Sequence, residues 1–93
     1  MLDRNEAMRE AMAFLAEASV SWGASSDVRI IPEYCFTDQE RFIAPYDNVA
    51  YLDHGNEDMQ LGGNLPVAVD LNTGSCRFLS LEETEDFMER DVL

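Results

Sequence analysis

The sequence predicts an α+β fold that consists of a small antiparallel sheet of about four strands with an N-terminal and a C-terminal helix, in the order α-β-β-β-β-α. Three observations predict this class. Apolar residues recur at helical spacing near both ends of the chain, whereas apolar residues between positions 28 and 79 alternate or run continuously. Turn-forming residues at 70–74 separate two of the apolar runs. At 93 residues, the chain is expected to form a single domain, 1–93.

The first helix is predicted at Arg4–Ala18. Asp3 and Glu6 have the spacing of a capping box, in which each side chain accepts a hydrogen bond from the other residue's backbone. One face of this helix is apolar and consists of Met8, Ala11, Met12, Leu15 and Ala18. Ser19–Asp27 is expected to be a loop. We expect Trp22 in this loop to close an edge of the core, with an exposed binding anchor as the alternative.

Two strands are predicted in the next part of the chain. Apolar residues alternate over Val28–Phe36, and Pro32 within this run predicts an edge strand or a bulge, because proline cannot donate a ladder hydrogen bond. Alternation over Arg41–Tyr46 predicts the second strand. Val49–Leu52 is expected to continue it or to form a short further strand, and Asp53–Gly63 to be an irregular loop.

The clearest segment is a hairpin formed by the last two strands. Leu65–Leu71 is almost continuously apolar, which predicts a central strand that is covered on both faces. Asn72 and Thr73 favour a bend, and Gly74 can adopt the positive φ that closes a bulged hairpin. The returning strand is therefore antiparallel and ends near Leu79.

The second helix is predicted at Leu81–Arg90. Ser80 and Glu83 repeat the capping-box spacing. The apolar face consists of Leu81, Thr84, Phe87 and Met88. We expect both helices to pack on the same face of the sheet.

The composition indicates an acidic protein-binding module. The chain has 19 acidic and 6 basic residues, all of them arginine, and its net charge is −13. This charge opposes binding to nucleic acid or to an anionic membrane and favours a protein partner with a basic face. Two acidic segments are the candidate partner-binding sites. The first comprises Asp53, His54, Glu57 and Asp58, and the second comprises Glu82, Glu83, Asp86 and Glu89.

An alternative is that the charge serves only solubility. Recognition would then depend on an apolar and aromatic patch around Trp22, Tyr46 and Tyr51.

No catalytic residue, cofactor or metal site is expected. The chain has no glycine-rich phosphate loop, no GxSxG or HExxH motif, and only one histidine. Asp53–Asp58 lacks the ligand pattern of an EF-hand loop. Cys35 and Cys76 stand far apart and are expected to be reduced, packed thiols. With neither a membrane span nor a secretion signal, we expect a cytoplasmic protein.

Several segments resemble a known family. They are the leading amphipathic helix, Phe42-Ile43-Ala44-Pro45-Tyr46-Asp47, Tyr51-Leu52, Leu61–Asp70 and Asn72-Thr73-Gly74. The most specific part has the order Gly-Gly-Asn-x-Pro-Val-x-Val-Asp-x-x-Thr-Gly, a structural rather than a chemical signature. Over residues 28–78, this pattern is similar to the immunity protein 35 family, also called the YrhB domain family.

The resemblance implies a function in bacterial competition. Such a protein is made beside a polymorphic or contact-dependent toxin, and protects the producing cell by binding that toxin. Two other classes remain open, namely a small chaperone-like or general interaction protein, and an enzyme whose site the sequence does not reveal.

Overall fold

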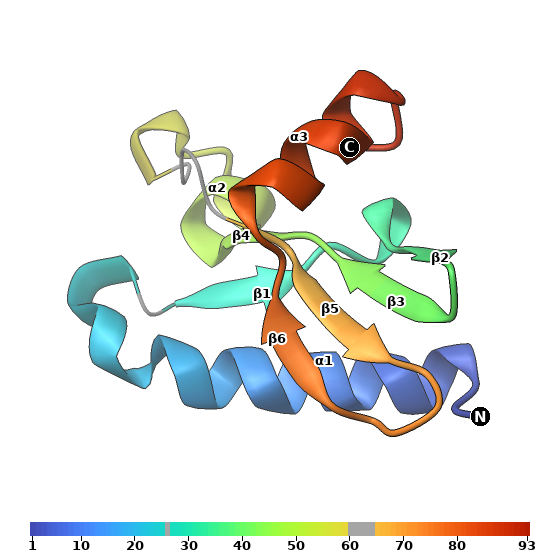
Figure 1. Cartoon of the computed structure of the whole chain (residues 1–93). Coiled ribbons are helices and arrows are strands. Elements are labelled where there is room, and N and C mark those ends of the chain that lie inside the picture. Colours follow the sequence, from blue (N-terminus) through green and yellow to red (C-terminus); the bar gives the residue numbers. More distant parts are fainter. Residues whose placement is uncertain (26, 60–64) are drawn as a thin grey trace.

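The computed structural model describes residues 1–25, 27–59 and 65–93, and confirms the α+β class (Figure 1). Its helices are α1 (Arg4–Ser19), α2 (Val49–His54) and α3 (Leu81–Glu89), with 3-10 turns η1 (Val20–Ser25), η2 (Pro32–Tyr34) and η3 (Glu57–Met59). Its strands are β1 (Val28–Ile30), β2 (Phe36–Asp38), β3 (Arg41–Ala44), β4 (Tyr46–Asn48), β5 (Val67–Asp70) and β6 (Cys76–Phe78). They form an antiparallel sheet of order β2-β3-β5-β6 and a separate β1-β4 ribbon.

The four-stranded sheet separates two apolar cores. In β5, Val67 and Val69 belong to the core under α1, whereas Ala68 lies in the core under α3, and all three are buried. This confirms a central strand that is covered on both faces. The expectation that both helices pack on one face is wrong, because apolar side chains of both parities in β5 need a cover on each side. Figure 1 shows α1 and α3 on opposite sides of the sheet.

Helix α1 begins as predicted. Glu6 N–H donates to Asp3 Oδ1 at 2.8 Å, and Asp3 N–H donates to Glu6 Oε1 at 3.1 Å, so both halves of the capping box are formed. The helix buries Ala7, Ala11 and Leu15 against the sheet. Two small residues on this face allow the helix to approach the strands closely.

The predicted loop after α1 contains the 3-10 turn η1, and the structure confirms the core position of Trp22. The Trp22 ring stacks on Tyr46, with 5.9 Å between the ring centroids, and also contacts Phe78. Trp22 therefore closes an edge of the core under α1.

The single strand predicted over Val28–Phe36 is wrong, because the chain changes sheet within it. β1 pairs with β4, then η2 begins at Pro32, and β2 joins the edge of the four-stranded sheet. Proline fixes φ and has no N–H group, which suits the first position of a helical turn. Cys35 N–H closes this turn by donating to Pro32 O at 3.3 Å.

The following segment departs from the prediction for similar local reasons. The strand predicted over Arg41–Tyr46 is divided at Pro45 between β3 and β4. The expectation of strand at Val49–Leu52 is wrong, since these residues form α2. Asn48 caps this helix by accepting a hydrogen bond from Ala50 N–H at 2.8 Å, and Gly55 ends it at φ +68°.

The β5–β6 hairpin confirms the predicted turn. Gly74 adopts φ +79°, and its N–H donates to Asp70 O at 2.7 Å. Asp70 Oδ1 also accepts hydrogen bonds from the N–H groups of Asn72 and Thr73. Residues 60–64, which include the Gly62-Gly63-Asn64 part of the family pattern, and Ser26 of the expected loop lie outside the described residues.

Helix α3 ends one residue before the predicted limit, in a Schellman motif. Asp91 N–H donates to Met88 O and Val92 N–H donates to Phe87 O, both at 3.1 Å. Asp91 adopts φ +60° at the position where glycine is most common. This motif turns the chain back towards η2. No helix in the described ranges is both long enough and apolar enough to cross a membrane.

Candidate functional site

Most arginine side chains pair with acids of the chain itself. Ion pairs join Arg29 to Asp53, Arg41 to Asp38 and Glu83, Arg77 to Glu83, and Arg90 to Asp38 and Asp86. Arg4 donates to Pro32 O and lies over the Phe42 ring. Few cationic groups therefore remain to offset the excess of acids on the outer surface.

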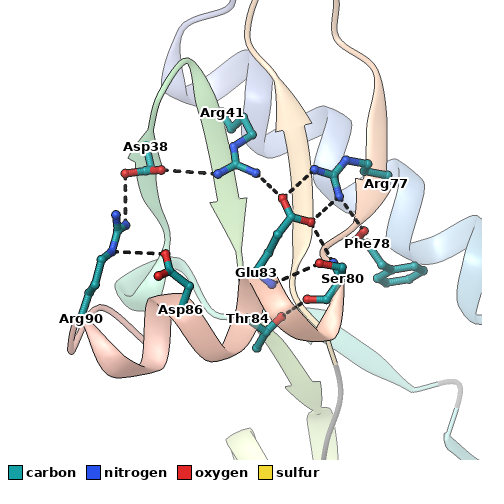
Figure 2. Close-up of polar contacts among 9 residues, drawn as sticks. All are labelled: Asp38, Arg41, Arg77, Phe78, Ser80, Glu83, Thr84, Asp86 and Arg90. Carbon is teal, nitrogen blue, oxygen red and sulfur yellow. Dashed lines mark hydrogen bonds and ion pairs between the residues drawn. The ribbon is translucent and has the colours of Figure 1, made fainter.

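Glu83 is the centre of the largest of these networks (Figure 2). Its Oε2 accepts from Arg41 Nη1 at 2.7 Å, while Arg77 donates to both of its carboxylate oxygens at 2.9 Å. Glu83 also completes the α3 capping box with Ser80. The arginine contacts, Arg77 first, and the Ser80 backbone N–H hold the pKa of Glu83 well below its usual range.

The network continues along the same side of α3. One carboxylate oxygen of Asp38, on β2, accepts a hydrogen bond from Arg41 at 3.4 Å, and the other accepts one from Arg90 at 3.2 Å. Arg90 also lies over the Phe87 ring, 4.8 Å from its centroid. These contacts attach α3 to the edge of the sheet above the buried Phe87.

The four predicted partner-binding residues of α3 therefore divide into two groups. Glu83 pairs with two arginines of the sheet, and Asp86, although exposed, pairs with Arg90 at the end of its own helix. Glu82 and Glu89 are exposed and make no ion pair within the described part of the chain, and the same holds for Glu85 between them. The second group forms the outer face of α3, defined here as Glu82, Glu85 and Glu89.

The other predicted segment lies at the end of α2 and in η3. Asp53 accepts from Arg29 Nε and Nη2 at 3.2 and 2.6 Å, and this pairing lowers its pKa. His54 is exposed in the last turn of α2. Glu57 and Asp58 are exposed in η3 and form no ion pair with any residue that the structure describes.

An apolar hollow of about 600 Å³ lies between η2 and the C-terminal end of α3. We call it the anchor groove. It is lined by Glu33, Tyr34, Cys35, Phe36, Pro45, Tyr46, Pro66, Thr84, Met88, Asp91, Val92 and Leu93. The sequence did not indicate this site. The one local feature that relates to it is Pro32, because a proline at this point ends the predicted strand and places the next two residues in a turn.

The aromatic residue that a partner can reach beside the anchor groove differs from those of the predicted aromatic patch. Trp22 and Tyr46, proposed as centres of an aromatic patch, contact each other within the core, and Tyr51 is partly buried. Tyr34 is instead 62% exposed. A second hollow of about 690 Å³, lined in part by Tyr51 and Glu57, shares Glu33 and Tyr34 with the anchor groove. Glu57 of the first acidic segment and the C-terminal end of α3 therefore both lie next to η2.

Burial changes the pKa of two side chains that line the anchor groove. Burial raises the pKa of Cys35 to about 11 and that of Tyr46 to about 12, so both are protonated at neutral pH. Over the described ranges, no three His, Cys, Asp or Glu side chains come together in a possible metal site.

No protein-family model, curated protein or solved structure matches the chain. The resemblance to the immunity protein 35 family therefore stays a prediction.

Proposed function

We propose that this chain is a bacterial immunity protein, which binds a cognate protein toxin in the cytoplasm and neutralises it by direct contact. One observation carries the proposal. The chain has a net charge of −13, and four of its six arginines are held in internal ion pairs among the described residues, which leaves an anionic exterior. Such an exterior attracts a protein with a basic face and repels nucleic acid and anionic membranes.

The internal ion pairs also make this surface well defined. Glu83 and Arg90 fix α3 to the sheet through Arg41, Arg77 and Asp38, so the outer face of α3 projects its carboxylates in a constant direction. Fixed charges of one sign accelerate encounter with an oppositely charged partner, and this effect weakens as salt is added. We propose binding rather than catalysis, and the apolar lining of the anchor groove supports this choice.

Affinity capture from the native cell, followed by mass spectrometry, identifies the partner. The captured protein is then expressed alone and together with this chain in a bacterial host. We expect a basic protein that stops growth when it is alone, and growth that recovers when this chain is present. A partner that is harmless when expressed alone would contradict the toxin proposal.

The anchor groove favours a second candidate, a general interaction or chaperone-like protein without a dedicated toxin. Exposed apolar side chains such as Tyr34 and Met88 could contact many unfolded segments. Suppression of aggregation of several unrelated unfolded proteins would favour this candidate. Binding to a single folded basic partner would favour the immunity protein.

A further inference from the structure

We propose that the anchor groove binds one apolar side chain of the partner, presented on a segment in which arginine or lysine flanks that side chain. This inference deepens the proposed function and rests on it for the identity of the partner. It assigns the apolar centre of the interface to η2 and the end of α3, beside the acidic surfaces that steer encounter.

The first argument is the convergence of exposed apolar side chains. Eight large hydrophobic side chains are exposed among the described residues, and four of them, Tyr34, Met88, Val92 and Leu93, line this one hollow. Single exposed apolar residues are common on protein surfaces, but several in one concave place indicate a binding site. A volume of about 600 Å³ is sufficient for a large side chain and its neighbours.

The second argument is the charge of the groove lining. Glu33 and Asp91 both line the groove, and neither forms an ion pair with the residues described. No arginine lines it, although four arginines pair with acids elsewhere. An apolar side chain with basic neighbours would fill the groove and pair with these two carboxylates, whereas an acidic segment would be repelled.

The same charges argue against a second copy of this chain as the occupant. Two copies each carry a net charge of −13, and a symmetric contact through the groove would bring Glu33 and Asp91 of both copies together. Like charges placed opposite one another cost free energy when water is excluded.

The residues that line the groove suit this role. Tyr34 offers an aromatic ring with few rotatable bonds, and tyrosine is enriched among residues that dominate binding energy. Met88 is flexible and adapts to the shape of an inserted group. Both are more than half exposed, so their substitution should leave the fold intact.

Short synthetic peptides and amide NMR spectra of the full chain test the proposal. The first probe has a central tryptophan flanked by arginines, the second replaces tryptophan with serine, and the third replaces the arginines with glutamates. We expect the first probe to shift the amides of residues 33–36 and 88–93, with weak or absent shifts for the other two. Shifts confined to the outer face of α3, or equal shifts with the serine peptide, would overturn the proposal.

A matched pair of variants tests the same groove with the tryptophan peptide alone. Met88→Lys places a positive charge in the groove, whereas Met12→Lys makes the same change on α1, where the methionine is similarly exposed at 54% against 57%. We expect Met88→Lys to weaken binding of the tryptophan peptide by about tenfold or more, and Met12→Lys by less than about twofold. Equal effects of the two variants would overturn the proposal.

These outcomes separate the groove from the proposed function. If the Met88→Lys variant neutralises a basic toxin as well as the wild type does, the groove inference is wrong but the immunity function stands. Peptide binding in the groove, together with a captured partner that is harmless when expressed alone, would keep the groove and remove the toxin.

Discussion

Arg77 and Glu83 form a two-pronged ion pair, in which both Nη atoms of the arginine lie 2.9 Å from separate oxygens of the carboxylate. The pair joins β6 to the first turn of α3 across the loop that contains the helix cap. The same carboxylate also accepts from Arg41 on β3, so one side chain fixes the position of α3 on the sheet. Bidentate arginine pairs of this kind are more specific in geometry than single contacts.

Replacing Glu83 with alanine should destabilise the fold. The change removes three arginine contacts and one half of the capping box, so we expect a loss of about 1.5–3 kcal/mol in the free energy of unfolding. Urea unfolding followed by circular dichroism measures it. Glu85→Ala, on the outer face of α3, is the control and should change stability by less than about 0.5 kcal/mol. Equal losses for the two variants would show that the network contributes nothing measurable.

Stability should depend on pH through the same carboxylate. The pKa of Glu83 is depressed in the folded protein, so the unfolded chain binds more protons below the ordinary value of 4.5, and stability falls as pH falls through this range. Unfolding free energies at several pH values between about 6 and 3 should therefore decline more steeply for the wild type than for Glu83→Gln. Parallel pH curves for the two proteins would contradict the depressed pKa.

The turn at Gly74 should resist a β-branched residue. Gly74 lies at φ +79°, while a Cβ there would meet only the Leu2 side chain at an ordinary 3.7 Å, so backbone strain is the main cost. We expect Gly74→Val to lose on the order of 1–3 kcal/mol, and Gly74→Asn to lose less, because asparagine tolerates this conformation. Thermal melting compares the three proteins. A valine variant that melts with the wild type would show that the turn relaxes without cost.

Cys35 should react slowly with alkylating agents. Burial raises its pKa to about 11 from an ordinary value of 9.0, so its thiolate fraction at pH 8 is about one hundredth of that of a free thiol. Mass spectrometry after timed exposure to iodoacetamide, with glutathione as the reference thiol, measures the rate. Alkylation of Cys35 as fast as that of glutathione would mean that the thiol is open to water.

Features determined by a few neighbouring residues could be predicted from the sequence. Both capping boxes, the positive φ of Gly74 and the two-sided burial of β5 depend on short local patterns. The errors arose where a single residue redirected the chain. Pro32 and Pro45 divided the expected strands between two sheets, and the Asn48 side chain capped a helix in place of a strand.

The candidate site was less predictable, because it depends on contacts between distant segments. Composition indicated the acidic character, but it could not show that Glu83 and Asp86 pair internally whereas Glu82 and Glu89 do not. The Glu83 pairs depend on where arginines of the sheet meet α3, whereas Asp86 pairs with Arg90 four positions along the chain. The anchor groove was missed for the same reason, since it forms only where η2 meets the end of α3.

We propose that exposed acids on α3 steer a basic partner, and association kinetics with the captured partner test this proposal. The double variant Glu82→Gln/Glu89→Gln removes two charges from the outer face of α3, at positions seven residues apart in the sequence. Glu10→Gln with Glu17→Gln removes two at the same spacing from exposed positions on α1, across the sheet. We expect the α3 pair to lower the association rate several-fold at low salt and to flatten its salt dependence, with a much smaller effect of the α1 pair. Association rates that both pairs leave unchanged, or lower equally, would contradict steering by this face.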